Sequence, residues 1–300
     1  MNRHGAAARL ASLALIPTLL AGCLDAAVPS AAPTLGPTPE PTPPTITYAP
    51  GTTVWYEGLV ITVKAVTATL DKRGGPVVVV LRLENPGADD AELNARVLLQ
   101  VDAGAAPVTP TRESKIPTVP ATGTAEATLT FELQGVASID KAVVLVGDPP
   151  LHVARAPLTA AGGEAAALQP IELRLSGGGT AGDLRIALRG ALLRWDLPDW
   201  SEEMGAELAV LTVGYDVTYL GTFSGGFAFT GDNVALRLPT NVLVESRHDG
   251  HSQSIELIGA GKTRNGLSSR FELPNGMTGR FALVVRNGSA SKAIPFVVGG

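Results

Sequence analysis

Three short stretches of the chain hold the side chains that are most capable of chemistry. The first is a thiol, Cys23, the only cysteine in the sequence. The second is a histidine pair, His248 and His251, which flank Asp249; imidazoles and carboxylates are ligand types for zinc or copper. The third is the segment 195–204, which contains two of the three tryptophans and four carboxylates. These stretches predict thiol modification, metal binding and recognition of a partner, respectively.

The segment 195–204 is the most unusual loop of the sequence. Exposed tryptophan is favoured at binding hot spots, and clustered carboxylates suit calcium. The acids lack the alternating Asp-x-Asp-x-Asp-Gly pattern of a calcium loop, so contact with a protein or ligand is the better functional interpretation. The candidate contact residues are Trp200, Asp199, Glu202 and Glu203. The structural alternative is that Trp195 ends a strand and fills a core, while the acids are simply solvated.

The histidine pair has a structural alternative as well. Asp249-Gly250 favours a tight turn, and the segment joins two strand-like runs, so an exposed hairpin is the preferred interpretation. No third and fourth ligand lies nearby in sequence, and His248, Asp249 and His251 remain weak metal candidates. His152 is expected to be a half-exposed strand residue.

The thiol of Cys23 closes a segment with the pattern of an export signal. Arg3 and Arg9 precede an apolar run over 10–20, and small residues follow. A run of this length is too short for a membrane-spanning helix, which needs about 20 residues. Residues 1–22 are therefore expected to be a signal peptide.

Leu20-Ala21-Gly22-Cys23 resembles the lipobox of bacterial lipoproteins. The resemblance implies cleavage before Cys23 and attachment of a diacylglycerol, a palmitate-type anchor that holds the chain on the lipid bilayer. Two or more acyl chains anchor a protein stably. The expected location is the cell membrane, on its extracytoplasmic, extracellular-facing side. An unmodified leftover thiol and a buried core cysteine are the two alternatives.

The composition of the chain argues against a nucleic-acid partner and limits how the fold can be stabilised. Loss of Arg3 and Arg9 with the leader changes the formal net charge from −5 to −7. A mildly acidic chain without clustered Lys and Arg does not suggest nucleic-acid binding. No disulfide can form within one chain, so stability must come from buried cores. The length that remains allows about two domains.

A proline- and threonine-rich stretch follows the thiol, and residues 23–45 are assigned as a linker. Proline fixes φ and removes a hydrogen-bond donor, so the whole stretch 26–50 is expected to be an extended spacer that cannot build a sheet. After Pro50 the apolar period becomes two, as in 59–66 and 184–189, and turn residues bound each run. The pattern predicts an all-β fold without an amphipathic helix.

Two similar halves are indicated by matching segments at an offset near 140. Phe131-Glu132-Leu133 matches Phe271-Glu272-Leu273, and residues 94–99 match 233–238. The fold is thus identified as similar to bacterial lipoproteins with tandem immunoglobulin-like β-sandwich domains. The predicted domains are 46–160 and 165–300, joined at 160–168. The disulfide cysteines of antibody domains are missing.

No motif points to catalysis. The chain has no Gly-x-Ser-x-Gly elbow and no His-Glu-x-x-His, and Ser176-Gly177-Gly178-Gly179 lacks the lysine of a phosphate loop. We expect a non-enzymatic envelope lipoprotein without a cofactor that contacts an unidentified protein or ligand. The alternative is a lipoprotein that captures a small molecule, a carbohydrate or a metal ion, and a hydrolase with a dispersed site is a third class.

Overall fold

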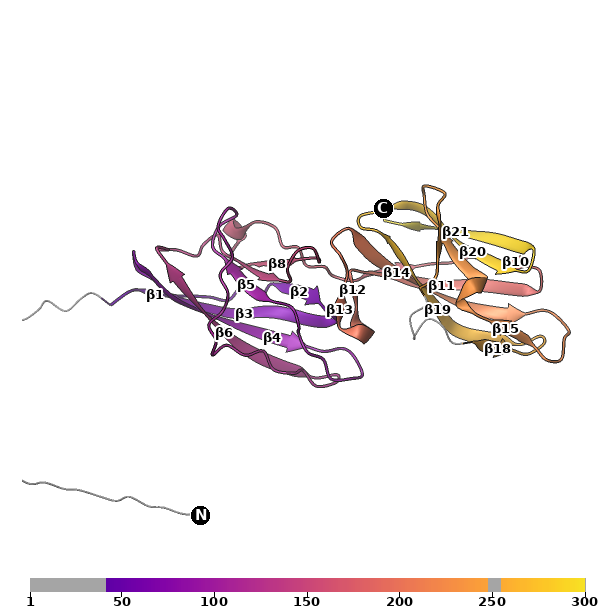
Figure 1. Ribbon diagram of the computed structural model, residues 1–300, viewed down its shortest axis with the longest axis horizontal. Helices are drawn as coiled ribbons and strands as arrows, with labels where there is room; N and C mark the ends of the chain where they lie inside the picture. Colours follow the sequence, from indigo (N-terminus) through magenta and orange to yellow (C-terminus); the bar gives the residue numbers. More distant parts are fainter. Residues whose placement is uncertain (1–41, 248–254, 300) are drawn as a thin grey trace, which may run out of the picture. The chain divides into compact units, whose positions relative to one another are not determined.

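The computed structural model describes residues 42–247 and 255–299, and this part of the chain is built from β-strands (Figure 1). The described residues contain no α-helix, only three short 3-10 helices: η1 (Ala160–Gly162), η2 (Pro198–Trp200) and η3 (Gly231–Asn233). The strand pairs in this part of the chain are antiparallel, which confirms the predicted all-β class. From Pro43 onward the chain forms one compact unit.

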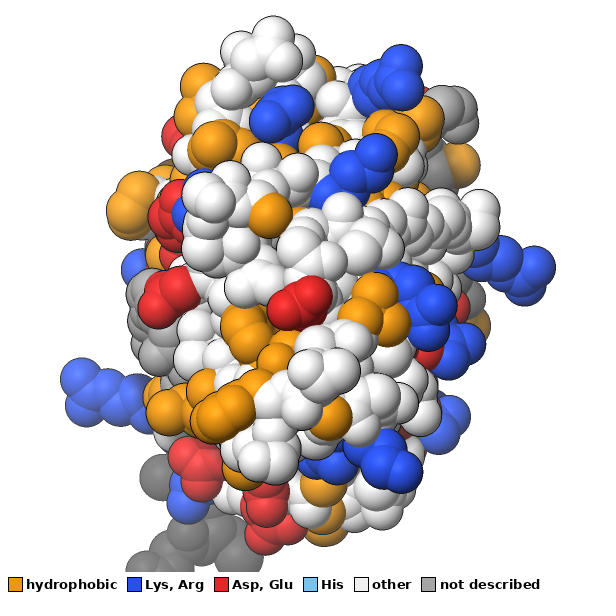
Figure 2. Space-filling model, turned by 90° about the vertical axis from the view of Figure 1, so that its right-hand side faces the viewer, with side chains coloured by type: hydrophobic (Ala, Val, Ile, Leu, Met, Phe, Trp, Pro, Cys, Tyr) orange, Lys and Arg blue, Asp and Glu red, His pale blue; other side chains and the backbone are white. Residues whose placement is uncertain are grey.

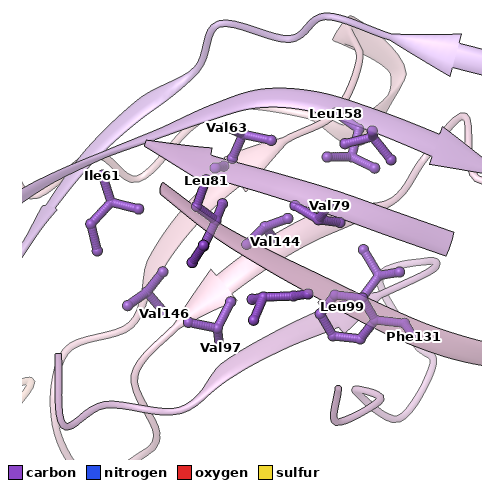
Figure 3. Packing of buried hydrophobic residues seen from close by; sticks show 14 of the residues in the cluster. Ile61, Val63, Val79, Leu81, Val97, Leu99, Phe131, Val144, Val146 and Leu158 are labelled. Atoms are coloured by element: carbon purple, nitrogen blue, oxygen red, sulfur yellow. The ribbon is translucent and has the colours of Figure 1, made fainter. Parts of the chain in front are cut away.

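The N-terminal half of this unit consists of two sheets. The larger sheet contains β1 (Thr45–Tyr48), β2 (Thr53–Tyr56), β3 (Leu59–Thr69), β4 (Gly74–Glu84) and β6 (Thr124–Gln134). The smaller sheet contains β5 (Val97–Gln100), β7 (Val143–Val146) and β8 (Ala154–Pro157). Apolar side chains of both sheets meet in one core, which Figure 3 shows around Leu81, Leu99 and Phe131.

The alternation of β3 explains how this core is filled. Leu59, Ile61 and Val63 point inward at a period of two, as the sequence predicts. The register then shifts at Lys64, which is an extra residue relative to β4, and Val66 resumes the inward face. A bulge of this kind moves the phase by one position without exposing the apolar side chains.

The C-terminal half again consists of two sheets around a core of its own. The larger sheet contains β9 (Ile171–Arg174), β10 (Gly178–Ala181), β11 (Leu184–Arg194), β14 (Leu208–Tyr219) and β19 (Thr263–Pro274). The smaller sheet contains β16 (Val234–Arg237), β17 (Leu243–Glu245), β20 (Gly279–Asn287) and β21 (Ala290–Val298). Two short ladders pair β12 (Asp196–Leu197) with β13 (Glu202–Glu203) and β15 (Phe227–Phe229) with β18 (Glu256–Ile258).

The two halves share one strand order. The path β3-β4-β6 corresponds to β11-β14-β19, and β5-β7-β8 corresponds to β16-β20-β21. The two Phe-Glu-Leu triplets lie in β6 and β19, which occupy the same place in their sheets. The register shift of β3 at Lys64 has its counterpart in β11 at Arg189. This agreement supports an internal duplication, whereas the boundaries of two separately folding domains stay a prediction.

Two local expectations are wrong. A spacer over 26–50 that cannot enter a sheet is contradicted by β1, which pairs with residues 66–69 of β3. Thr45–Tyr48 contains no proline, and it lies at a sheet edge where only one row of hydrogen bonds is needed. The alternation of Phe281, Leu283 and Val285 with the residues between them predicts one buried face for β20, yet Ala282 and Val284 on the opposite face are buried as well.

The halves differ most in the connection between their first two long strands. In the N-terminal half β3 and β4 are joined by residues 70–73, whereas β11 and β14 are joined by residues 195–207. The longer connection forms the β12–β13 hairpin. It therefore belongs to the C-terminal half alone, and it contains the candidate contact residues.

Candidate functional site

The segment 195–204 folds into a small hairpin with a turn of 3-10 helix at its tip. Asp196 pairs with Glu203 and Leu197 pairs with Glu202, and Pro198–Trp200 form η2 between them. Proline at the start of η2 supplies a preset φ, and Ser201 ends it in the left-handed region at φ 48°. The hairpin has an inner side and an outer side, which differ in burial.

The inner side carries an apolar cluster of its own. Leu197, Met204 and Val210 are buried together, with Leu208 packed against them. These side chains fix the hairpin to the start of β14. The backbone of the hairpin is therefore held in one position rather than left as a loose connection.

A turn of the N-terminal half sits against this hairpin. Glu57-Gly58 is the two-residue turn between β2 and β3, and both residues have positive φ, as a tight hairpin of this length requires. The Gly58 amide donates to Asp196 Oδ2 at 2.7 Å, and the Glu57 amide donates to Glu203 Oε2 at 3.4 Å. A Cβ on Gly58 would lie 2.9 Å from Cβ of Pro198, so only glycine allows this approach.

Arg194 completes the contact from the C-terminal side. Its Nε donates to Asp196 Oδ1 at 2.7 Å, and its Nη2 donates to Asp196 Oδ2 at 3.0 Å. Asp196 is buried, so the two-pronged pair with a guanidinium compensates a carboxylate that water does not solvate. The same carboxylate thus accepts hydrogen bonds from both halves of the compact unit.

A second row of hydrogen bonds joins the segment 150–152 to the end of the hairpin. The His152 amide donates to the Met204 carbonyl at 3.2 Å, and the Ala206 amide donates to the Pro150 carbonyl at 2.9 Å. The His152 ring contacts the Leu208 carbonyl through Nε2 at 2.7 Å. His152 is 6% exposed, so the expectation of a half-exposed strand residue is wrong. Its burial comes from residues far away in sequence.

The predicted joint at 160–168 pairs with the N-terminal half. The Trp55 amide donates to the Ala167 carbonyl at 2.8 Å, and Arg155 and Ala166 exchange backbone hydrogen bonds. The Tyr56 hydroxyl donates to the His152 carbonyl at 2.9 Å. We call the residues that make these contacts the junction: the turn 55–58, the segments 150–152 and 166–168, and the hairpin 194–208.

The candidate contact residues divide between the two sides of the hairpin. Asp199, Trp200 and Glu202 lie on the outer side, and Trp200 is 47% exposed. Asp199 forms an ion pair with Arg270 of β19. Glu203 is 4% exposed and faces the turn of the other half. The expectation that Glu203 belongs to an exposed contact surface is therefore corrected, since the burial of the junction removes it from solvent.

Three titratable groups of the junction have raised pKa values. Burial, and then the neighbouring charge of Asp196, raises the pKa of Glu203 to about 9. Burial also raises the pKa of Glu57, although the amide of Asn94 donates to its Oε2 at 2.7 Å. The pKa of Tyr56 is raised as well, chiefly by burial.

A cavity of about 270 Å³ opens beside the junction. It is lined by the loop 85–91 of the N-terminal half and by Arg194, Pro198, Asp199 and Ser201 of the C-terminal half. Asn85 shapes the loop, since its side chain donates to the carbonyls of Asp89 and Val119. Four of its lining residues are acidic (Glu57, Asp89, Asp90 and Asp199), and these groups would suit a small polar ligand.

Metal binding finds no geometric basis in the described residues. Within 42–247 and 255–299, no three His, Cys, Asp or Glu side chains are arranged to hold a metal ion. The carboxyls of Glu57, Asp196 and Glu203 therefore do not share a cation site. His248, Asp249 and His251 lie outside the described residues, as does Cys23.

Exposed apolar side chains also occur away from the junction. Phe223 is 66% exposed and Leu257 of β18 is 70% exposed. On the face drawn in Figure 2, hydrophobic side chains form separate groups among charged and polar ones. No helix among the described residues has the length and apolar character needed to cross a membrane.

A scan against protein-family models finds no match, and a search of curated proteins finds no relative of this chain. The sequence singled out the 195–204 segment as a candidate site, but it did not single out the Glu57-Gly58 turn that contacts this segment. Glu57-Gly58 between two strand patterns signals a tight turn, yet nothing local indicates that this turn is buried.

Proposed function

We propose that the protein is a non-enzymatic envelope lipoprotein that presents a compact β unit for contact with a protein or ligand. The observation that carries the proposal is the single cysteine, Cys23, which follows Leu20-Ala21-Gly22 behind a basic and apolar leader. The proline- and threonine-rich stretch after it suits a spacer between a lipid anchor and a folded unit.

The geometry of the junction supports a role in presentation. Backbone and side-chain hydrogen bonds join the two halves at several points, so the outer side of the hairpin is carried on a firm scaffold. Loops on rigid scaffolds are the usual place for binding. Asp199, Trp200 and Glu202 combine an aromatic surface with acidic groups there, which suits a partner with basic and apolar groups.

Capture of a small ligand is the second candidate function. The observation that favours it is the cavity beside the junction, which both halves line. Its polar lining would favour a carbohydrate or another small polar molecule over a lipid.

Membrane fractionation of the full chain and of Cys23→Ala in a bacterial host tests the anchor. Wild type should enter the membrane fraction and incorporate labelled palmitate. The variant should appear in the soluble fraction or as an uncut precursor, without label. Equal fractionation and equal labelling of the two proteins would contradict the proposal.

Photo-crosslinking on intact cells tests the contact surface. A crosslinking residue at Trp200 should capture a specific product, and the same residue at the exposed Phe223 serves as the matched control. Equal products from both positions would remove the hairpin from consideration. Glycan-array binding by the full chain would favour the second candidate function instead.

A further inference from the structure

The carboxyl group of Glu203 is the least satisfied polar group of the junction. Its Oε2 accepts the Glu57 amide at 3.4 Å, a long hydrogen bond, and its Oε1 is buried without a hydrogen-bond partner among the described residues. A buried carboxylate needs good donors, because water no longer solvates its charge. This geometry therefore disfavours the ionised form of Glu203.

The neighbours of Glu203 add to this effect. Asp196 lies directly across the β12–β13 ladder, and Glu57 faces Glu203 from the turn of the other half. Both residues are buried. Arg194 is the cation of the cluster, and its two hydrogen bonds go to Asp196. Three carboxyl groups thus meet one guanidinium in this part of the described chain, and ionisation of all three would leave uncompensated negative charge between the two halves.

Other titratable groups face this cluster from the elements packed against it. Tyr56 of β2 feels the charges of Glu203, Glu57 and Asp148. The ring of His152 is turned to the Leu208 carbonyl, and Asp148 is paired with Arg96. None of these groups donates a hydrogen bond to Oε1 of Glu203. The net charge of the cluster therefore depends on whether Glu203 keeps its proton.

We propose that the junction is a protonation-controlled lock: the neutral carboxyl of Glu203 lets the Glu57–Gly58 turn sit against the β12–β13 hairpin, and ionisation of Glu203 releases the turn. Release breaks the hydrogen bond between the Gly58 amide and Asp196 and frees the two halves to move. Near neutral pH the lock is closed, since the pKa of Glu203 lies near 9. The inference does not depend on the proposed membrane anchor.

Tryptophan fluorescence of the full chain in detergent micelles tests the lock. All three tryptophans lie on junction segments: Trp55 on β2, Trp195 before β12 and Trp200 in η2. Titration of the wild type should show a change in emission with a midpoint near pH 9. Glu203→Gln copies the neutral carboxyl, so the change should disappear. Glu202→Gln, the exposed neighbour, should titrate like wild type.

A second variant separates the lock from other titrations. The charge of Glu57 raises the pKa of Glu203, so Glu57→Gln should move the midpoint to lower pH. An emission change that persists unaltered in Glu203→Gln would belong to tyrosine ionisation and would overturn the proposal. A midpoint that Glu57→Gln leaves in place, or moves upward, would overturn it as well.

Discussion

The amide of Gly58 donates a hydrogen bond to Oδ2 of Asp196 over 2.7 Å, although 138 positions separate the two residues in the chain. The donor belongs to a turn of the N-terminal half, and the acceptor belongs to the hairpin that only the C-terminal half possesses. The acceptor is held in place by Arg194. Asp196 is therefore one of the buried groups that join the two halves, and several expected outcomes rest on it.

Substitution of Gly58 by alanine should destabilise the protein. A non-glycine residue at φ +82° costs about 1–3 kcal/mol, and the new Cβ would also press on Pro198. Gly51→Ala is the matched control, because Gly51 has φ +64° with nothing within 4 Å of the added Cβ. Chemical denaturation should show a larger loss of unfolding free energy for Gly58→Ala. Equal losses would mean that the contact with Pro198 contributes nothing.

Asp196→Asn should be more harmful than Asp199→Asn. The first removes the carboxylate that pairs with Arg194 in a buried site, which costs about 3–5 kcal/mol. The second disrupts an ion pair whose carboxylate is exposed to solvent, which is worth about 0–1 kcal/mol. Thermal melting of both variants measures the difference. If the melting temperatures of the two variants agree, the buried pair is not structurally important.

The stability of the protein should fall as the pH rises between about 4.5 and 9. Below this window Glu203 is protonated in both the folded and the unfolded protein. Within it the unfolded chain releases the proton while the folded protein retains it, so each rise in pH favours unfolding. Glu203→Gln removes the part of this dependence that belongs to Glu203 and should stabilise the protein by at most about 3 kcal/mol at pH 7. Urea denaturation at several pH values, with Glu202→Gln as control, provides the measurement.

Substitution of either tryptophan of the hairpin should cost less stability than substitution of a core tryptophan. Trp195 is half-buried and donates its indole N–H to Asn275 Oδ1 at 2.8 Å. Trp195→Phe should therefore destabilise by about 1 kcal/mol through loss of this bond. Trp200→Ala should cost less than the about 3–5 kcal/mol of a core tryptophan, because the residue is 47% exposed. A loss of about 3 kcal/mol or more in Trp195→Phe would instead show a core position.

Separate expression of residues 46–160 and 165–300 tests the predicted domains. Each fragment keeps a complete apolar core, so each should give a cooperative melt. Each should also melt at a lower temperature than the full chain, because the cut exposes the junction. Fragments that fail to melt cooperatively, while the full chain does, would indicate that the two halves fold as one domain.

Sequence periodicity was sufficient to predict long strands such as β3 and β11, but it predicted neither β1 nor the junction. The alternation of Leu184, Ile186 and Leu188 with charged or small neighbours lies in β11 as expected, since local burial on one face produces a local pattern. Glu203 lies in a run of acids that reads as solvated, and His152 lies in an ordinary strand pattern. Both are buried by contacts between distant segments, and no local pattern encodes such contacts.

The hairpin of residues 195–207 also makes the two halves non-interchangeable. The N-terminal half contributes the Glu57–Gly58 turn, and the C-terminal half contributes the hairpin that this turn contacts. The order of the two halves along the chain is therefore fixed. The corresponding turn of the C-terminal half begins at Gly182, which lies against the side chain of Asn287 of its own half. If the two halves were exchanged in the chain, the hairpin would belong to the first half, with no preceding half to supply a turn. Gly58 would then have no following hairpin to contact. The longer connection at 195–207 therefore gives two halves of similar strand order a fixed order along the chain.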